Sequence, residues 1–213
     1  MSAICGVIFP EEISDLSLLL SKRDILHNAM AHRGPDGSGV WNNRQAAFGH
    51  QMMHVSPESL KEKQPYVYKN ERLVCISDAR IDNRNDLFER IGVTDLSISD
   101  SELILLAYKK WGEDCPKYLL GDFTFAIWDS LKKKLFCGRD HIGIRQFFYT
   151  VQENIFYFST ELQALLKIRN TIDCNIERVK MHFAQKLAGN SDNSTYYNEV
   201  FTLCPASSLT LHN

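Results

Sequence analysis

The residues of this chain that could carry chemistry are few and lie far apart. Ser2 becomes the first residue once Met1 is removed, and His32 and His141 carry imidazole side chains, a type that serves in acid–base chemistry. The six cysteines include no Cys-x-x-Cys pair, and no Cys and His ligands are closely spaced, so the sequence predicts no metal site. Each histidine stands alone in a loop-like segment, where a structural role is expected. The open question is whether Ser2 is a chain end that reacts.

The composition excludes several classes of protein. The formal net charge of −2 leaves no basic field, so no nucleic-acid partner is expected. The apolar runs are much shorter than a membrane span and no secretion signal precedes them. We therefore expect a cytoplasmic protein without membrane contact, whose cysteines are reduced and mostly buried. Neither GxGxxG nor GxxxxGKS/T occurs, so no phosphate-binding loop and no cofactor is expected in this domain.

Short strands and a few helices must position these residues. Apolar runs predict strands over residues 3–9, 40–41, 46–50, 73–76, 123–128, 135–137, 147–149 and 155–158. Helical spacing predicts helices over residues 14–31, 86–91, 100–111, 161–168 and 176–187. Ser14 or Asp15 is placed to cap the first helix, and Asp100 the third. Because strands and helices come in clusters and do not alternate, the order indicates an α+β fold with mainly antiparallel sheets.

Four segments carry a resemblance to a known family. They are AHRGPDGSG (residues 31–39), GDFTFAIWD (121–129), GRDHIGIRQFFY (138–149) and FSTELQALL (158–166). In this order and spacing they resemble the amino-terminal domain of asparagine synthetases, a class II glutamine amidotransferase of the N-terminal-nucleophile hydrolase type. The resemblance implies a four-layer αββα sandwich. It covers residues 1–170, so residues 171–213 are expected to be a carboxy-terminal extension of the same domain, leading to a synthetase domain outside this chain.

In active members of this family the mature chain begins with a cysteine, whose thiol attacks the side-chain amide of glutamine. The cysteine's own α-amine is the base, since an amine with a pKa of about 8 transfers protons readily at neutral pH. Alignment without a gap places Ser2 at the nucleophile position and Cys5 inside the first strand. A hydroxyl is a weaker nucleophile than a thiol, so Ser2 would need an otherwise intact site.

The resemblance also locates the oxyanion hole, and there the sequence departs from the family. The family segment Asn-Gly-Glu-Ile-Tyr-Asn corresponds to residues 78–83, which read Asp-Ala-Arg-Ile-Asp-Asn. Asp78 stands where the family has a neutral amide donor, and an ionised carboxylate donates no hydrogen bond. Loss of one such donor costs about 10²–10³ in rate, and we expect an anion in its place to cost more. Ala79 can still offer its backbone N–H.

The substrate pocket implied by the family is altered as well. Met52 takes the position of the arginine that holds the glutamine carboxylate, a role that a thioether cannot fill. Arg33 and Asp100 match family pocket residues, and Asp100 has the position that meets the substrate amine. Arg80 replaces a glutamate. We predict that Arg80 pairs with Asp78 or Asp100 and fills the pocket with an ion pair.

These replacements resemble those of lasso-peptide macrolactam synthetases and β-lactam synthetases, which keep the domain as a scaffold and do not use glutamine. The expected protein is an ATP-dependent, amide-forming ligase, whose synthetase domain is the first partner of this domain and binds ATP and magnesium. A precursor peptide and a second copy of the chain are further partners that the sequence leaves open. Two alternatives also stay open. One is an active glutaminase that uses Ser2, or Cys5 after removal of residues 1–4; the other is a free-standing interaction module that docks through a sheet edge or an apolar patch.

Overall fold

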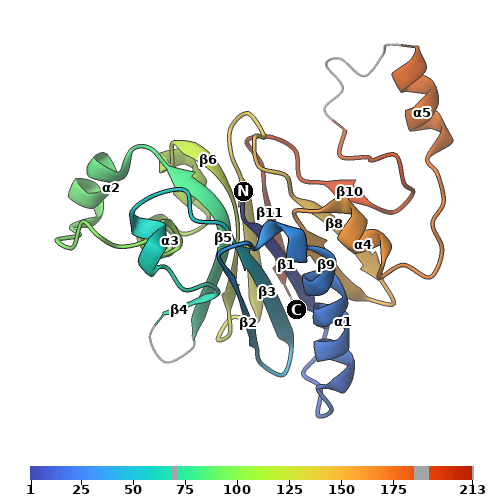
Figure 1. Cartoon of the computed structure of the whole chain (residues 1–213), viewed down its shortest axis with the longest axis horizontal. Coiled ribbons are helices and arrows are strands. Elements are labelled where there is room, and N and C mark those ends of the chain that lie inside the picture. Colours follow the sequence, from blue (N-terminus) through green and yellow to red (C-terminus); the bar gives the residue numbers. More distant parts are fainter. Residues whose placement is uncertain (69–71, 185–191, 213) are drawn as a thin grey trace.

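Two antiparallel β-sheets stacked face to face form the centre of the molecule (Figure 1). The computed structural model describes residues 1–68, 72–184 and 192–212. The six-stranded sheet has the order β10 (Phe201–Thr202), β8 (Phe148–Gln152), β9 (Ile155–Ser159), β1 (Ala3–Ile8), β3 (Ala46–Met52), β2 (Gly37–Asn42). The five-stranded sheet has the order β11 (Ser208–His212), β7 (Lys134–Arg139), β6 (Gly121–Asp129), β5 (Leu73–Ile81), β4 (Tyr66–Tyr68).

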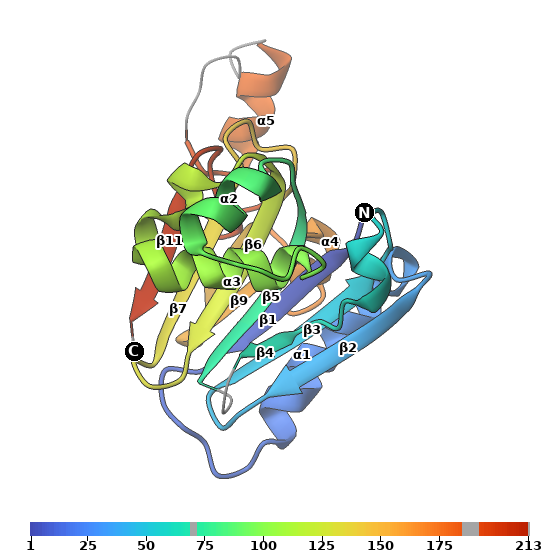
Figure 2. The ribbon, with the colours of Figure 1, turned by 90° about the vertical axis from the view of Figure 1, so that its left-hand side faces the viewer.

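Helices cover the outer faces of both sheets, so the molecule has four layers. α1 (Ser17–Ala29) and α4 (Leu162–Leu166) pack on the six-stranded sheet, and α2 (Arg84–Ile91) and α3 (Asp100–Trp111) pack on the five-stranded sheet (Figure 1 and Figure 2). Short 3-10 helices lie at Ala31–Arg33, Glu58–Lys61 and Gly112–Tyr118. The predicted αββα sandwich with antiparallel sheets is confirmed.

Strand alternation divides the buried apolar side chains into three cores, one between each pair of neighbouring layers. In β1, Ile4 and Ile8 point into the core between the sheets, whereas Cys5 and Val7 point into the core under α1. The third core lies between the five-stranded sheet and α2 and α3. Each sheet therefore has two buried faces, which explains why its strands read as dense apolar runs in the sequence.

The packing around Gly6 in β1 leaves no room for a side chain. A Cβ at this position would lie 2.2 Å from the ring of Phe158 and 2.7 Å from the ring of Phe48. Phe158 stacks on Phe147 with 5.2 Å between ring centroids and meets Phe48 edge-on at 5.7 Å. These three rings fill the space between the sheets over the β1 backbone.

The structure extends some of the predicted strands and adds others. β5 continues to Ile81, five residues past the predicted end at residue 76, because the polar side chains of Ser77, Asp78 and Arg80 conceal a strand that remains fully paired with β6. The prediction lacks β4, β10 and β11. β10 and β11 each form one edge of a sheet, so the carboxy-terminal part of residues 171–213 is built into both sheets.

The helices also begin and end differently from the prediction. α1 begins at Ser17 with Leu16 at its N-cap and no side-chain cap, while the Asp15 carboxylate accepts hydrogen bonds from the N–H and hydroxyl of Ser17. α5 (Ile176–Phe183) buries none of its residues and projects from the body of the molecule (Figure 1). Residues 185–187 of the helix predicted there lie outside the described residues. Among the residues that the structure describes, no helix combines the length and apolar character needed to cross a bilayer.

Candidate functional site

Ser2 directly precedes β1, Met52 ends β3 and Asp78 belongs to β5, and the three residues lie at one end of the space between the sheets. Ile4 in β1 and Ile76 in β5 point into this space, and Ser2 and Asp78 are two residues away on the same faces. Met52 follows the same rule in β3, where the even-numbered residues face the opposite sheet. The fold thus brings together three residues that the sequence assigned to the site.

Ser2 is held by the backbone of Met53, the residue that follows β3. The N–H of Met53 donates to Oγ of Ser2 at 3.0 Å, and the Ser2 hydroxyl donates to the Met53 carbonyl at 3.3 Å. The ammonium group of Met1 donates to the Met53 thioether sulfur. Both hydrogen-bonding roles of the hydroxyl are therefore taken by backbone groups. Among the described residues, no side chain accepts a hydrogen bond from it, so none is placed to take its proton.

Asp78 is buried beside Ser2 and carries a negative charge at neutral pH. Its Oδ2 lies 3.6 Å from Nη1 of Arg145. Burial raises the pKa of the Asp78 carboxyl to about 6, although Arg145, the charged chain end, Arg33 and the backbone N–H of Ser2 all lower it. Since this pKa remains below 7, the carboxylate form dominates at neutral pH, next to the residue at the nucleophile position.

Arg145 is a site residue that the sequence analysis missed. It lies in the loop between β7 and β8, and only 7% of its side chain is exposed. Within the described part of the chain, its Nε and Nη1 are buried without a hydrogen-bond partner. Its backbone N–H donates to Oδ2 of Asp140, which fixes the loop. A buried guanidinium that is incompletely paired attracts anions, and Asp78 is the anion that it faces.

Met52 lines a cavity of about 390 Å³ between β2, β3 and the segment before β4. Its wall also includes His50, Glu62 and Lys63. Burial lowers the pKa of His50 to about 4, so the ring is neutral at physiological pH. Ser2, Asp78 and Asp100 are absent from the residues that line this cavity. Met52 thus lies next to the nucleophile position in the fold and also contributes to the wall of this cavity.

Arg33 is engaged in an ion pair on the other side of the site. Its Nε donates to Oε1 of Glu161 at 2.6 Å, and its Nη2 lies 2.5 Å from the same oxygen. The two side chains line a hollow of about 440 Å³, together with His32 and Thr160. Arg33 is close enough to Asp78 to lower the pKa of that carboxyl, but its guanidinium is bound to Glu161.

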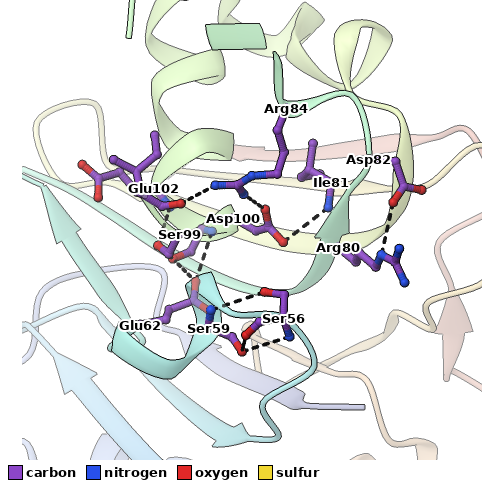
Figure 3. A network of polar contacts seen from close by, with 12 residues as sticks. Ser56, Ser59, Glu62, Arg80, Ile81, Asp82, Arg84, Ser99, Asp100 and Glu102 are labelled. Atoms are coloured by element: carbon purple, nitrogen blue, oxygen red, sulfur yellow. Dashed lines mark hydrogen bonds and ion pairs between the residues drawn. The ribbon is translucent and has the colours of Figure 1, made fainter. Parts of the chain in front are cut away.

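Asp100 has lost the free carboxylate that a substrate amine would need. Ser99 is the N-cap of α3, so Asp100 is the first residue of that helix and its carboxylate does not cap it. Arg84 Nη1 donates to Oδ1 of Asp100, and the N–H of Ile81 donates to Oδ2 at 3.3 Å (Figure 3). Burial raises the pKa of the Asp100 carboxyl to about 6, with Arg84 opposing the rise. Both oxygens of the Asp100 carboxylate thus already accept a hydrogen bond, one from Arg84 and one from the Ile81 backbone.

The predicted pairing of Arg80 with Asp78 or Asp100 is wrong. Arg80 Nε donates to Oδ1 of Asp82 at 3.2 Å, and two thirds of the Arg80 side chain is exposed (Figure 3). Arg80 lies near the end of β5, where an outward rotamer gives its charge access to water at little cost. Ala79 points to the opposite face of β5, into the core under α2 and α3.

Cys5 lies on the far side of β1 from the site. It is fully buried under α1, and desolvation raises the pKa of its thiol far above the ordinary value, so it stays protonated. Cys75, Cys115 and Cys137 are also buried, whereas Cys174 is exposed. In the described part of the chain, no group of three or more His, Cys, Asp or Glu side chains could hold a metal ion.

A comparison with known families identifies the domain. The family described as "Glutamine amidotransferase domain" matches residues 1–213. The chain belongs to this family. It is the class II glutamine amidotransferase domain of an asparagine synthetase-like protein. The resemblance drawn from the four sequence segments is confirmed at this level.

Several relatives carry the asparagine synthetase name. The domain is 34% identical over 147 residues to asparagine synthetase (glutamine-hydrolyzing) 3 of Bacillus subtilis (strain 168), a match that covers 67% of the chain and 24% of the relative. It is 30% identical over 180 residues to putative asparagine synthetase (glutamine-hydrolyzing) 2 of Methanocaldococcus jannaschii, covering 75% of the chain and 35% of the relative. The domain thus spans about a quarter to a third of the length of these relatives.

Solved structures of other proteins share the fold. Glutamine phosphoribosylpyrophosphate amidotransferase from B. subtilis superposes with a TM-score of 0.63 at 13% identity, over 99% of this chain and 49% of that one. A structure described as the allosteric regulatory enzyme of purine biosynthesis gives a TM-score of 0.68 at 12% identity, over 99% of this chain and 47% of that one. At these identities the likeness supports the fold alone.

Proposed function

We propose that this domain does not hydrolyse glutamine and serves as a scaffold within a larger amide-forming ligase. The observation that carries the proposal is the buried carboxylate of Asp78 beside Ser2. Glutamine hydrolysis builds negative charge on the amide oxygen in the transition state, and a neighbouring anion raises the energy of that charge in a buried site. Asp78 would therefore oppose the relatives' glutaminase reaction at the oxyanion position, where that reaction needs its negative charge stabilised.

Both charged groups of a bound glutamine would also lack their partners. The α-carboxylate would meet the thioether of Met52, which carries no charge and no donor. The α-ammonium would have to displace the guanidinium of Arg84 from Asp100. A substrate that loses both of its charged contacts loses affinity as well as orientation, and misplacement by about 1 Å can cost 10² in rate.

The larger protein, in this proposal, is an ATP-dependent ligase related to lasso-peptide macrolactam synthetases or β-lactam synthetases. Its synthetase domain would bind ATP and magnesium, activate a carboxylate, and let an amine already present in the substrate attack it. A precursor peptide is the proposed substrate class, and the compartment is cytoplasmic. The support is the relatives' length together with a pocket that no longer suits an ammonia donor.

A glutaminase with Ser2 as nucleophile is the second candidate. The position of Ser2 at the end of β1, between the sheets, favours it. The hydrogen bonds of its hydroxyl disfavour it, because both are made to the backbone of Met53 and neither to the terminal amine that serves as the base in this family. Cys5 receives no support as a nucleophile, since its thiol is protonated and faces away from the site.

Ammonia release from glutamine tests the proposal. We expect no release above background from the wild-type domain, or from Ser2→Cys alone. The triple variant Ser2→Cys, Asp78→Asn, Met52→Arg restores the nucleophile, a neutral donor and a cation, and should release ammonia measurably. The matched control Ser2→Cys, Asp82→Asn, Met53→Arg carries the same kinds of change at neighbouring positions and should not. Wild-type release that disappears in Ser2→Ala would overturn the proposal.

The ligase assignment has a separate test. With ATP, magnesium and a candidate precursor peptide, the full-length protein should form an amide bond at a rate that neither glutamine nor ammonium chloride changes. A rate that requires glutamine would assign the protein to the glutamine-dependent synthetases. A protein that forms no amide bond under these conditions, yet binds another protein through this domain, would favour the interaction module.

A further inference from the structure

We propose that the carboxylate of Asp78 binds the chain's own terminal ammonium group when the chain begins at Ser2, so that an internal ion pair locks the amino terminus. The assignment deepens the proposed function, on which it rests, because an amine held as an ammonium by a carboxylate cannot act as a base. Asp78 is thereby a positioning residue for the chain end, and it also opposes negative charge on the amide oxygen of a substrate.

The first argument is that the Asp78 carboxylate already faces the backbone nitrogen of Ser2. The N–H of Ser2 and the charged chain end both act on this carboxylate. Two hydrogen bonds between Ser2 and Met53 fix Ser2 in this place. When Met1 is removed, the nitrogen of Ser2 changes from an amide into an ammonium group without any movement of the strand. A single N–H donor thus becomes three donors and a full positive charge.

The second argument is that the buried Asp78 carboxylate lacks a close cationic partner. Asp78 is 7% exposed, and its nearest cation, Arg145, stands at 3.6 Å, beyond an ordinary hydrogen bond. Arg33 is close but is bound to Glu161. A buried carboxylate is costly unless it is paired and hydrogen-bonded, and these two cations leave Asp78 incompletely paired. The terminal ammonium would supply the missing partner.

The third argument is the poor environment of the ammonium group in the chain that keeps Met1. That group lies on an exposed residue, and its hydrogen-bond acceptor is the thioether of Met53, a weak one. Removing Met1 moves the positive charge one residue inward, from a sulfur atom to a carboxylate. The groups that act on the new ion pair are Arg145, which lies in the β7–β8 loop, and Arg33, from the turn after α1. Both repel the ammonium, and Asp78 must outweigh them.

A pH titration by NMR tests the assignment. The protein is released from a cleavable fusion so that it begins at Ser2, and its amines are labelled by reductive ¹³C-methylation. We expect the α-amine to titrate about one pH unit higher in the wild type than in Asp78→Asn, because the variant removes the opposite charge. The control Asp82→Asn, which removes an exposed carboxylate from the same segment, should leave the titration unchanged. Equal values in the wild type and in Asp78→Asn would overturn the assignment.

A second measurement needs no substitution, so it remains decisive if Asp78→Asn does not fold. The Asp78 carboxyl is titrated by ¹³C NMR in the form that begins at Ser2 and in the form that keeps Met1. Its pKa should be lower in the form that begins at Ser2. An identical pKa in both forms would contradict the ion pair. Both titrations report on the amine and the carboxyl directly, so they remain valid whether or not the domain hydrolyses glutamine.

Discussion

At the scale of single residues, the site contains two buried aspartates, each paired with an arginine. Asp78 faces Arg145, and Asp100 is bound to Arg84. Both carboxyl groups have a pKa raised to about 6 because burial outweighs the attraction of the arginine. In each pair the attraction of the arginine is therefore smaller than the cost of burying the carboxylate. Protonation of the carboxyl removes both effects, so the stability of each pair changes with pH.

Asp78 and Asp100 should each lower the stability of the domain as the pH rises from about 4 to about 6, whereas His50, whose pKa is lowered from 6.5 to about 4, should raise it over nearly the same window. In this window the folded form binds protons at the two aspartates more tightly than the unfolded form, so their contribution to the free energy of unfolding decreases with pH and levels off above it. For Asp78 the change is at most about 3 kcal/mol, from 1.4 kcal/mol per unit of pKa. The difference between the wild type and Asp78→Asn in urea unfolding at pH 4.5 and 7, both in the Met1-containing form, measures it.

Asp78→Asn should reduce this dependence, since an amide does not titrate, while Asp82→Asn should leave it as in the wild type. An equal change in stability between pH 4.5 and 7 in the wild type and in Asp78→Asn would contradict a raised pKa at this residue.

Removal of Arg84 should destabilise the domain strongly. Arg84→Ala leaves the Asp100 carboxylate buried without its cation, and loss of one partner from a buried pair costs about 3 kcal/mol. The loss should be larger at pH 7 than at pH 5, where part of the Asp100 population is protonated. Arg80→Ala, which breaks the exposed pair with Asp82, should change the stability by less than about 0.5 kcal/mol. Similar losses from the two substitutions would argue against the Arg84 contact.

At the scale of elements, β5 illustrates what the sequence can and cannot predict. Its apolar half, Val74 to Ile76, is evident from the run of side chains, and so is its partner β6. Its polar half, which carries Asp78, could not be recognised as a strand from the sequence. Residues near a site face water or charged groups instead of an apolar core, so they lack the apolar pattern of a strand. Family resemblance supplied the positions of Ser2 and Asp78, but not their partners. Arginine side chains reach many neighbours, so only the fold selects Arg145 and Arg84.

The start of β6 should be intolerant of a side chain. Gly121 has a φ of +138°, and a Cβ there would lie 2.1 Å from the carbonyl oxygen of Arg80 in β5. Gly121→Ala therefore combines backbone strain with a collision against a paired strand, and should cost more than about 2 kcal/mol. Gly92→Ala, with φ +82° and open space around the added carbon, should cost only about 1 kcal/mol. Thermal unfolding compares them, and equal costs would exclude the collision.

At the scale of the whole molecule, three apolar cores link four layers, so the loss of packing between the sheets should weaken the entire domain. Phe158 lies at the centre of that packing, in contact with Phe48 and Phe147. Phe158→Ala should destabilise the domain by about 3–5 kcal/mol because it opens a cavity that the surrounding rings cannot fill. Phe183→Ala, on the exposed α5, should have almost no effect. Denaturant unfolding gives both values, and a small loss at Phe158 would contradict a shared core.

The edge strands β10 and β11 determine where the chain can be truncated. Each is the outermost strand at one edge of its sheet, and β11 pairs with β7 from Lys134 to Gly138. A fragment cut before Phe201 would lose both strands and turn β8 and β7 into edge strands with unpaired backbone N–H and C=O groups. All residues of β7 are buried in the intact domain, so its newly exposed edge can pair with strands of other molecules. Such a fragment should aggregate during purification, whereas one that retains His212 keeps β7 covered by β11.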